Sequence, residues 1–195
     1  MKRFIRFAAV LFAVALPFGS APLHAAAPIF DQVNGAKNRI GFVFTQMGVP
    51  VEGHFRKSSI DLAFDAAAPA KSSVRLELDL GSIDAGSPDA NQEVVGKTWF
   101  DLKNFPTATF VSTAVKPLGG NRYEMSGKLT IKGRSRDITT PVTFTQRGDT
   151  AVFEGGFTLK RLEFAIGDGS WSDTSIVADE VKVSFHVEAD RRPAK

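Results

Sequence analysis

The sequence predicts an all-β protein built around a small antiparallel β-barrel. Apolar and polar residues alternate with a period of two along most of the chain, and glycine-containing turns separate the alternating segments. The stretch from Phe157 to Val183 combines these features, because two alternating segments flank an Arg-x-x-Phe-x-Ile-Gly turn and a tryptophan-containing loop. The interior of such a barrel must be filled by side chains or by an apolar ligand.

Residues 1–26 are predicted to form a cleaved signal peptide. Three basic residues precede an apolar run over residues 7–18, and a small-residue cleavage site follows at residues 23–25. The alternative is an uncleaved membrane anchor, but the run is shorter than the roughly 20 residues that span a bilayer, and Pro17 interrupts it. We therefore expect one barrel domain over residues 27–190 and a charged tail over residues 191–195.

The charge balance argues against nucleic acid as a partner. The chain has 24 basic and 21 acidic residues, and residues 1–26 hold three of the basic ones and no acidic one, so the mature balance is 21 − 21, or zero. A neutral chain has no basic field to attract a polyanion. We interpret the cluster of Lys128, Lys132, Arg134 and Arg136 as a solvated strand and turn, with an anion site as the alternative. The lack of cysteine removes thiol nucleophiles and disulfides.

The strands follow one another along the mature chain. In the clearest case Val74, Leu76 and Leu78 alternate with charged residues, and residues 181–190 repeat the pattern. Further strands are expected at residues 39–46, 51–55, 60–65, 109–118, 122–131, 137–146 and 152–159. Glycine-containing turns separate the later strands. This spacing predicts eight or nine strands with meander connections.

One segment breaks the period of two. Residues 87–97 have the composition of a helix start, with Ser87 or Asp89 as the N-cap. The segment leads into the aromatic pair Trp99-Phe100. This pair has two interpretations: it plugs one end of the barrel as ordinary core, which is the simpler one, or it lies at a ligand entrance.

The inventory of catalytic groups is small. His54 and His186 are the histidines outside the predicted signal peptide, and both fall on the polar phase of their strands. They do not converge as a Ser-His-Asp arrangement or a histidine metal site requires. Asp168 and Asp173 flank Trp171 but lack the dense oxygen spacing of a calcium loop. We expect no enzyme and no metal. A hydrolase or isomerase using Asp101 and Asp173 is an alternative, which requires a raised carboxyl pKa.

The phenylalanine content is unusual, with seventeen phenylalanines against one tyrosine. Several fall on the inward phase of the strands: Phe42, Phe44, Phe64, Phe110, Phe144, Phe157 and Phe185. These rings either pack the barrel solid or line a lumen for a long apolar chain, since burial of each CH₂ group contributes about 0.8 kcal/mol. Composition alone does not distinguish a filled barrel from a hollow one.

Several motifs occur in an order and spacing that resemble the YceI-like family. They are Val51-x-Gly53-x-Phe55, Val74-x-Leu76-x-Leu78, Ser82-Ile83-Asp84-x-Gly86, Phe100-Asp101, Phe105-Pro106-x-Ala108-x-Phe110, Gly127-x-Leu129-Thr130-Ile131-x-Gly133, Arg161-x-x-Phe164-x-Ile166-Gly167 and Ala178-Asp179-Glu180-Val181. Each motif is weak alone, but the ordered set covers nearly all of the mature chain. The resemblance implies an eight-stranded lipocalin-like β-barrel with one short helix. It also implies a periplasmic, non-enzymatic protein whose apolar lumen holds a polyisoprenoid quinone, a polyprenyl phosphate or another long-chain amphiphile.

The chain departs from this family pattern at two places. Family members often have a histidine before the glycine of the first hairpin, where this chain has Gln46-Met47-Gly48. They also tend to carry an Arg-Asp pair ahead of the short helix, where this chain reads Asp89-Ala90-Asn91-Gln92. If those residues contact a ligand head group in the family, this protein prefers a different head group.

These observations give one leading hypothesis, a periplasmic carrier of a polyisoprenoid or similar lipid. The expected lining residues are Phe42, Phe44, Leu76, Leu78, Phe110, Met125, Phe144, Phe157 and Phe185. The candidates for the mouth or lid are Trp99, Phe100, Phe164 and Trp171. The expected partners are an isoprenoid quinone, a polyprenyl phosphate or a fatty amphiphile, with transient contact to a membrane or membrane protein and a monomeric or homodimeric state. The alternative is a filled barrel that binds a protein through its outer surface.

Overall fold

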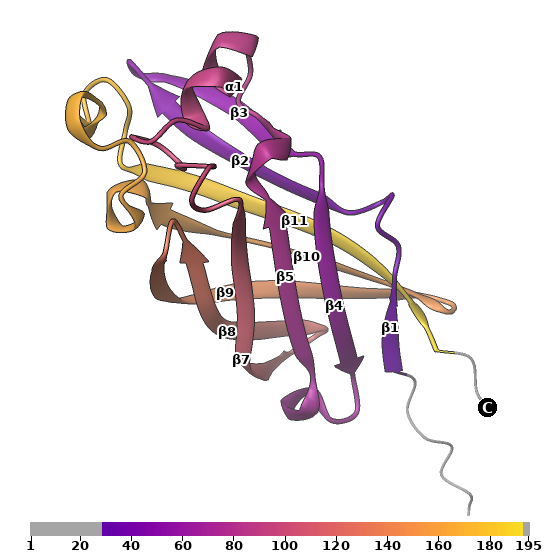
Figure 1. The fold of residues 1–195 in the computed structure, drawn as a ribbon. Coiled ribbons are helices and arrows are strands. Elements are labelled where there is room, and N and C mark those ends of the chain that lie inside the picture. The colour runs from indigo at the N-terminus through magenta and orange to yellow at the C-terminus, as the bar shows by residue number, and fades with distance from the viewer. Residues whose placement is uncertain (1–28, 193–195) are drawn as a thin grey trace, which may run out of the picture.

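One antiparallel sheet dominates the computed structural model, which describes residues 29–192 (Figure 1). Its strands are β1 (Ile29–Val33), β2 (Arg39–Gln46), β3 (Val49–Phe55), β4 (Ser58–Asp65), β5 (Ser73–Asp79), β6 (Ile83–Asp84), β7 (Thr107–Gly119), β8 (Arg122–Ile131), β9 (Arg134–Arg147), β10 (Thr150–Lys160) and β11 (Glu180–Arg191). Eight of them, β1, β4, β5 and β7 to β11, close into a barrel, because β1 pairs with both β4 and β11. The predicted signal peptide and residues 193–195 lie outside the described residues.

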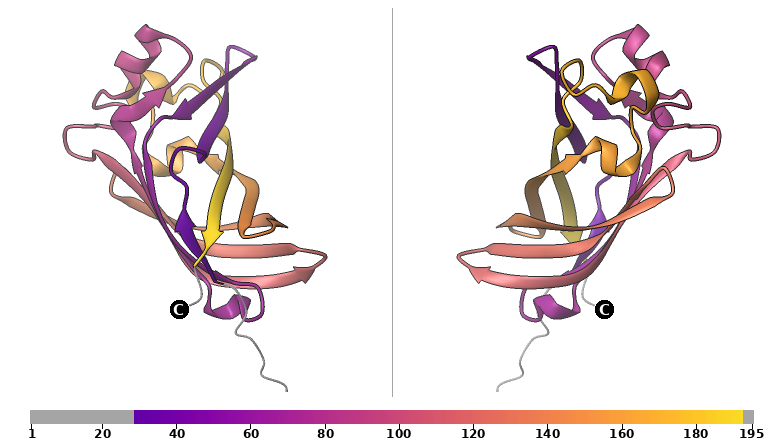
Figure 2. Two further views of the ribbon diagram at one scale, coloured as in Figure 1. Left: turned by 90° about the vertical axis from the view of Figure 1, so that its right-hand side faces the viewer. Right: turned by 90° about the vertical axis from the view of Figure 1, so that its left-hand side faces the viewer.

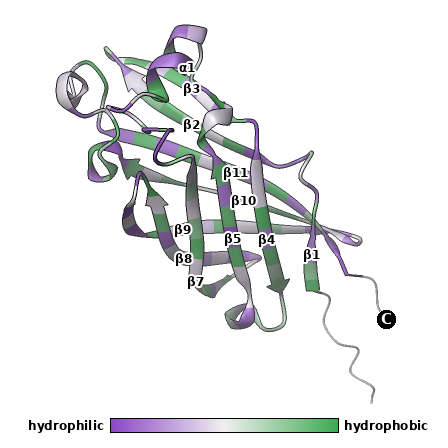
Figure 3. Cartoon of the chain, viewed as in Figure 1, coloured by the Kyte–Doolittle hydropathy of each residue, from purple (hydrophilic) through white to green (hydrophobic). Residues whose placement is uncertain are grey.

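The long strands form where the sequence alternates, as predicted. β10 and β11 pair without a bulge from Thr150 opposite Asp190 to Lys160 opposite Glu180. Apolar and polar positions alternate along the strands in Figure 3, which places one set of side chains inside the barrel and the other outside. The fold class is therefore the predicted one, an all-β, eight-stranded antiparallel barrel with one helix.

The strand that closes the barrel is β1, which the sequence pattern did not predict. Phe30 is its fully buried residue, and it pairs with Phe64 on one side and Arg191 on the other. The strand has only five residues, of which Ile29 and Gln32 are exposed. Such a short segment does not show a recognisable alternation. Pairing with β1 also places Arg191, expected at the start of the charged tail, within β11.

The barrel widens at the end away from β1. There β2 takes the place of β1 beside β11 and pairs with it from Arg39 to Val43. β2 turns back into β3, which then pairs with the two-residue strand β6. Figure 2 shows this hairpin and the helix α1 (Pro88–Val94) at the end of the barrel opposite the C-terminus. The sheet therefore has one narrow, fully paired end and one splayed end.

Helix α1 confirms the predicted break in the alternation but is shorter than expected. The Ser87 side chain accepts a hydrogen bond from the Ala90 N–H and caps the first turn. The helix ends at Val94, and the Gly96 N–H bonds to the Glu93 carbonyl instead of continuing the helical ladder. Irregular chain then carries Trp99 and Phe100 back across the wide end of the barrel.

The apolar interior consists of two clusters. At the narrow end, rings from β1, β4, β8, β9 and β10 pack edge to face, with the centroids of Phe64 and Tyr123 5.1 Å apart and those of Phe64 and Phe153 5.0 Å apart. The second cluster occupies the middle and the wide end and includes Leu80, Trp99 and Phe164. The first cluster is dense, whereas the second surrounds an open space.

Candidate ligand cavity

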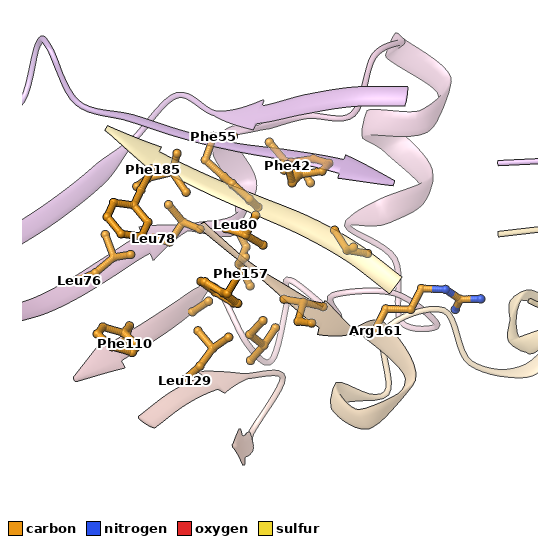
Figure 4. Close-up of a pocket in the computed structure, with 18 of the residues that line it drawn as sticks. Phe42, Phe55, Leu76, Leu78, Leu80, Phe110, Leu129, Phe157, Arg161 and Phe185 are labelled. Carbon is orange, nitrogen blue, oxygen red and sulfur yellow. The ribbon is translucent and has the colours of Figure 1, made fainter. Parts of the chain in front are cut away.

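The barrel encloses a cavity of about 610 Å³ that runs from the wide end to the residues of the narrow-end cluster. Its wall is almost entirely apolar and is formed by strands around the barrel and by the loops at the wide end. The residues labelled in Figure 4 are Phe42, Phe55, Leu76, Leu78, Leu80, Phe110, Leu129, Phe157, Arg161 and Phe185. This volume falls in the range of small-molecule sites, about 300–1,000 Å³. The lumen is therefore hollow, and the filled-barrel alternative does not describe it.

Glycines on the inward phase of the strands make room for the phenylalanine rings. A Cβ atom built on Gly127 would overlap the ring of Phe110, which reaches diagonally across from the neighbouring strand. In the same way Gly53 lies beneath its pairing partner Phe42, and Gly155 beneath its pairing partner Phe185. The rings bend over these glycines along the wall instead of filling the centre. This packing explains how so many phenylalanines surround an open lumen.

The cavity has a closed floor. Phe64, Tyr123 and Phe153 belong both to the dense narrow-end cluster and to the cavity wall. Phe144 lies behind them, with its ring centroid 5.0 Å from Phe64 and 5.5 Å from Phe153. The narrow end therefore closes the cavity, and the way into it lies at the wide end.

Two tryptophans lie at the wide end. The rings of Trp99 and Trp171 are 5.4 Å apart, and both residues line the cavity together with Phe100. The Trp171 Nε1–H donates to Glu93 Oε1 of helix α1 at 2.9 Å. This bond connects the tryptophan loop to the helix across the mouth, so the two segments together narrow the entrance.

Arg161 fixes the tryptophan loop from beneath. Its side chain is 1% exposed, and its five N–H groups donate to the carbonyls of residues 166, 167, 171, 177 and 178 at 2.7–3.1 Å. Its guanidinium also lies 5.6 Å from the Trp99 ring centre. Burial lowers the pKa of Arg161, and the nearby carboxylates of Asp179 and Asp168 act in the opposite direction. In Figure 4 its charged end points away from the apolar side chains of the cavity.

One buried polar group of the wall is unpaired. Trp99 is 8% exposed, and its indole Nε1–H is buried without a hydrogen-bond partner among residues 29–192. Buried indole N–H groups usually have a partner. Because less than 1 Å² of this nitrogen is accessible, the N–H is enclosed by the surrounding protein.

The structure places the predicted site residues around this cavity, with two exceptions. Phe42, Phe44, Leu76, Leu78, Trp99, Phe100, Phe110, Met125, Phe157, Trp171 and Phe185 lie in its wall. Phe144 has the predicted inward direction but lies in the narrow-end cluster below the floor. Phe164 is also fully buried, but it packs in the second cluster beneath Arg136, with the guanidinium 6.0 Å from the ring centre, and not at the mouth. Contact of the remaining residues with a ligand stays a prediction.

Sequence reasoning missed several wall residues. Phe55 and Val183 line the cavity and lie on the same inward strand phase as their predicted neighbours, so the alternation was sufficient to find them. Leu80 continues the spacing of Leu76 and Leu78 but lies in the 3-10 turn after β5. Arg161 is different, because nothing in the residue pattern marks a charged residue after a strand as buried. The carbonyls that bind Arg161 belong to residues 166–178, and only the folded loop brings them around its guanidinium.

The residues considered for an enzyme, a calcium site or an anion site make contacts within the protein. Asp173 accepts hydrogen bonds from the hydroxyl and backbone N–H of Ser175, and these bonds hold its carboxyl pKa below the usual range, opposite to the shift that a catalytic acid requires. Asp168 instead lies 3.6 Å from Lys132. Lys132 itself donates to the Ala165 carbonyl at 2.6 Å, and Lys128 pairs with Asp137 at 2.9 Å.

The two histidines point outward, as their strand phase predicted. His54 is exposed on β3, and His186 lies 2.9 Å from Glu154 on the outer face of the barrel. Within residues 29–192, no three His, Cys, Asp or Glu side chains come together as a metal site would require. No helix in this part of the chain is long and apolar enough to cross a membrane.

Comparison with known proteins places the chain among relatives of the same fold. Residues 32–189 match the model of the YceI-like domain. A UPF0312 protein of Pseudomonas savastanoi pv. phaseolicola is 31% identical over 172 residues, which cover 82% of this chain and 90% of that protein. The crystal structure of BcnA from Burkholderia cenocepacia is 48% identical, with a TM-score of 0.79 over 81% of this chain and 99% of that one.

A more distant structure shares the fold alone. It is described as a polyisoprenoid binding domain from Saccharophagus degradans implicated in plant cell wall breakdown. It is 14% identical to this chain and superposes with a TM-score of 0.66, covering 86% of this chain and all of that domain.

Proposed function

Because the chain belongs to the YceI-like family, we propose that it is a periplasmic carrier that holds a polyisoprenoid or other long-chain amphiphilic lipid in the barrel lumen. The observation that carries this proposal is the hollow, closed-floored cavity with its phenylalanine and leucine wall. The description of the Saccharophagus degradans domain as polyisoprenoid-binding supports the same class of ligand.

The energetics of the cavity favour an extended apolar chain. Each buried CH₂ group contributes about 0.8 kcal/mol, and the wall offers few polar groups that such a chain would leave unpaired. Thr140, one of the polar wall residues, already donates its hydroxyl to the Gly156 carbonyl at 3.0 Å. Binding therefore depends on the transfer of the apolar chain from water into the cavity, with head-group contacts confined to the mouth.

The role in the cell is part of the proposal. The predicted signal peptide at residues 1–26 supports export to the periplasm, where a lipid carrier shields its cargo from water. We do not expect catalysis, because Asp173 lacks the raised pKa that the enzyme alternative requires.

Native mass spectrometry of the protein purified from periplasm tests this function. We expect an adduct that organic extraction identifies as a long-chain lipid, or uptake of added isoprenoids by the delipidated protein. A bare protein mass, with no uptake of any isoprenoid or fatty amphiphile, would rule out the carrier function. Fractionation of cells that express the full chain tests the location, and a cytoplasmic protein that keeps Met1 would contradict it.

A further inference from the structure

We propose that the tip of the β2–β3 hairpin, where Met47 and Val49 lie beside Ile176, inserts into the surface of a lipid bilayer and holds the wide end of the barrel against it. The inference goes beyond the proposed carrier function, because it concerns the outside of the protein and does not depend on what the lumen contains. It depends on the exposure, backbone conformation and charge of this hairpin tip, and on its place beside the cavity.

The hairpin tip carries the two most exposed large apolar side chains of the described residues. Met47 is 76% exposed and Val49 is 61% exposed. Ile176, which is also exposed, lies next to them, because the Met47 N–H donates to its carbonyl at 2.8 Å. A single exposed apolar residue is ordinary, whereas a group of them marks a contact surface.

Met47 is an unfavourable residue for its position in the turn. Gln46 pairs with Val49, so Met47 and Gly48 form a two-residue turn, with φ angles of 49° and 81°. Hairpin turns with positive φ at both central residues strongly prefer Asn, Asp or Gly at the first of them. A methionine side chain that points into solvent recovers little of this cost by packing, so the fold alone does not explain it.

The hairpin tip lies beside the wide end of the cavity. Gln46, the residue before the turn, lines the cavity, and so does Val177, which forms an isolated β-bridge with Gln46. Figure 2 shows the hairpin projecting at the end of the barrel opposite the C-terminus. Insertion of the tip therefore brings the wide end of the cavity to the lipid surface.

The charge of the hairpin tip fits a lipid surface. Residues 44–51 and 174–178 contain no charged residue, so their transfer into hydrocarbon removes no ion from water. The charged residues that directly border these two segments, Glu52, Asp173 and Asp179, are all acidic. The attraction is therefore apolar, and anionic lipids do not strengthen it.

The size of the hairpin tip argues against a protein partner. Stable protein interfaces engage about 20–30 residues on each side. The tip offers three exposed apolar side chains on a turn and the loop beside it. Such a narrow, projecting group suits insertion between lipid head groups better than the pairing of two protein surfaces.

A fluorescent label tests which part of the protein enters the bilayer. The chain has no cysteine, so Met47→Cys and Leu118→Cys each give one attachment site for the dye NBD, whose emission rises and shifts to the blue in hydrocarbon. Leu118 is the matched control, because it is 53% exposed and lies on the β7–β8 hairpin close to Tyr123 of the narrow-end cluster. With phosphatidylcholine vesicles we expect the blue shift at position 47 and none at position 118. Added phosphatidylglycerol or high salt should not change this result.

Met47→Asn separates bilayer contact from folding. Asparagine suits the positive φ at this position, so Tm should rise or stay the same. Vesicle binding, measured by co-sedimentation, should weaken about tenfold, because an apolar side chain is lost. Uptake of an apolar probe from solution should not change, since Met47 is not among the residues that line the cavity. Leu118→Asn should leave vesicle binding unchanged.

Several results would overturn the inference: a label at position 47 that ignores vesicles, equal responses at positions 47 and 118, unchanged vesicle binding in Met47→Asn, or binding that requires phosphatidylglycerol and disappears at high salt. A blue shift at position 47 that grows with protein concentration without vesicles would assign the tip to a second copy of the chain, and overturns it as well. Loss of probe uptake with the response at position 47 intact would remove the carrier function and leave this inference standing.

Discussion

The ring of Phe110 lies over the backbone of Gly127 on the neighbouring strand, in the space that a Cβ atom would occupy. This relationship keeps the ring against the barrel wall and the lumen open. We expect Gly127→Ala to push the ring toward the cavity, to lower the free energy of unfolding by about 1–3 kcal/mol and to weaken lipid binding. Chemical denaturation and probe displacement measure the two effects.

A second substitution tests whether the contact between the new methyl group and the Phe110 ring causes the loss of stability. Phe110→Leu in the Gly127→Ala background should recover part of the lost stability, because it removes the ring atoms that the new methyl group meets. Gly35→Ala is the matched control, since no atom lies within 4 Å of its Cβ position. Additive effects of the two substitutions would contradict the proposed packing.

A bulky side chain in the lumen should block binding while the barrel stays folded. Leu78 lines the cavity, so Leu78→Trp fills space that the empty protein leaves open, and we expect at least a tenfold loss of lipid affinity. Val111→Trp introduces the same side chain on the outer face, where Val111 is 39% exposed, and should leave the affinity unchanged. Titration with a fluorescent lipid compares them, and equal affinities would exclude the lumen as the binding site.

Replacing Arg161 should destabilise the whole wide end. Lysine at this position keeps the positive charge but has three donors on one nitrogen, so several of the five carbonyls lose their partners. We expect Arg161→Lys to reduce the free energy of unfolding by about 3 kcal/mol or more, measured by denaturant titration. Lys160 is exposed and precedes Arg161, so Lys160→Arg is the control variant. Equal stabilities of the two variants would show that the carbonyl network contributes nothing.

The pair of Glu188 and Lys37 predicts a pH dependence. The Lys37 ammonium donates to Glu188 at 2.6 Å, and this bond, with His186 nearby, holds the pKa of Glu188 below its usual value. A carboxyl whose pKa is lowered on folding stabilises the protein above its unfolded pKa, about 4.3, and loses this contribution as the pH falls through the lower folded value. Glu188→Gln should therefore lower Tm at pH 7, with the difference from the unmodified protein shrinking toward pH 3. A difference that does not change with pH would contradict this assignment.

The sequence predicted most of the barrel because alternation is a local signal. Residues 181–190 repeat apolar and polar positions often enough to be recognised, and they became most of β11. β1 and β6 were missed because five and two residues are too few to show a period. Their pairing depends on strands far away in the chain.

The candidate site shows the same limit. Strand phase predicted that Phe144 points inward, but not its height in the barrel, which the register with β10 sets opposite Phe153. Whether the lumen was filled or hollow also depended on cross-strand partners, such as Gly155 opposite Phe185. A glycine on the inward phase opposite a phenylalanine is the signal that would have favoured a hollow lumen.

Under the proposed carrier function, the closed floor sets how long an apolar tail the cavity can hold. A tail that enters from the wide end gains affinity with each added carbon until its tip reaches Phe64, Tyr123 and Phe153. Beyond that length, further carbons must fold back or remain at the mouth, in contact with water. The aromatic floor would thus limit a bound lipid by the length of its tail.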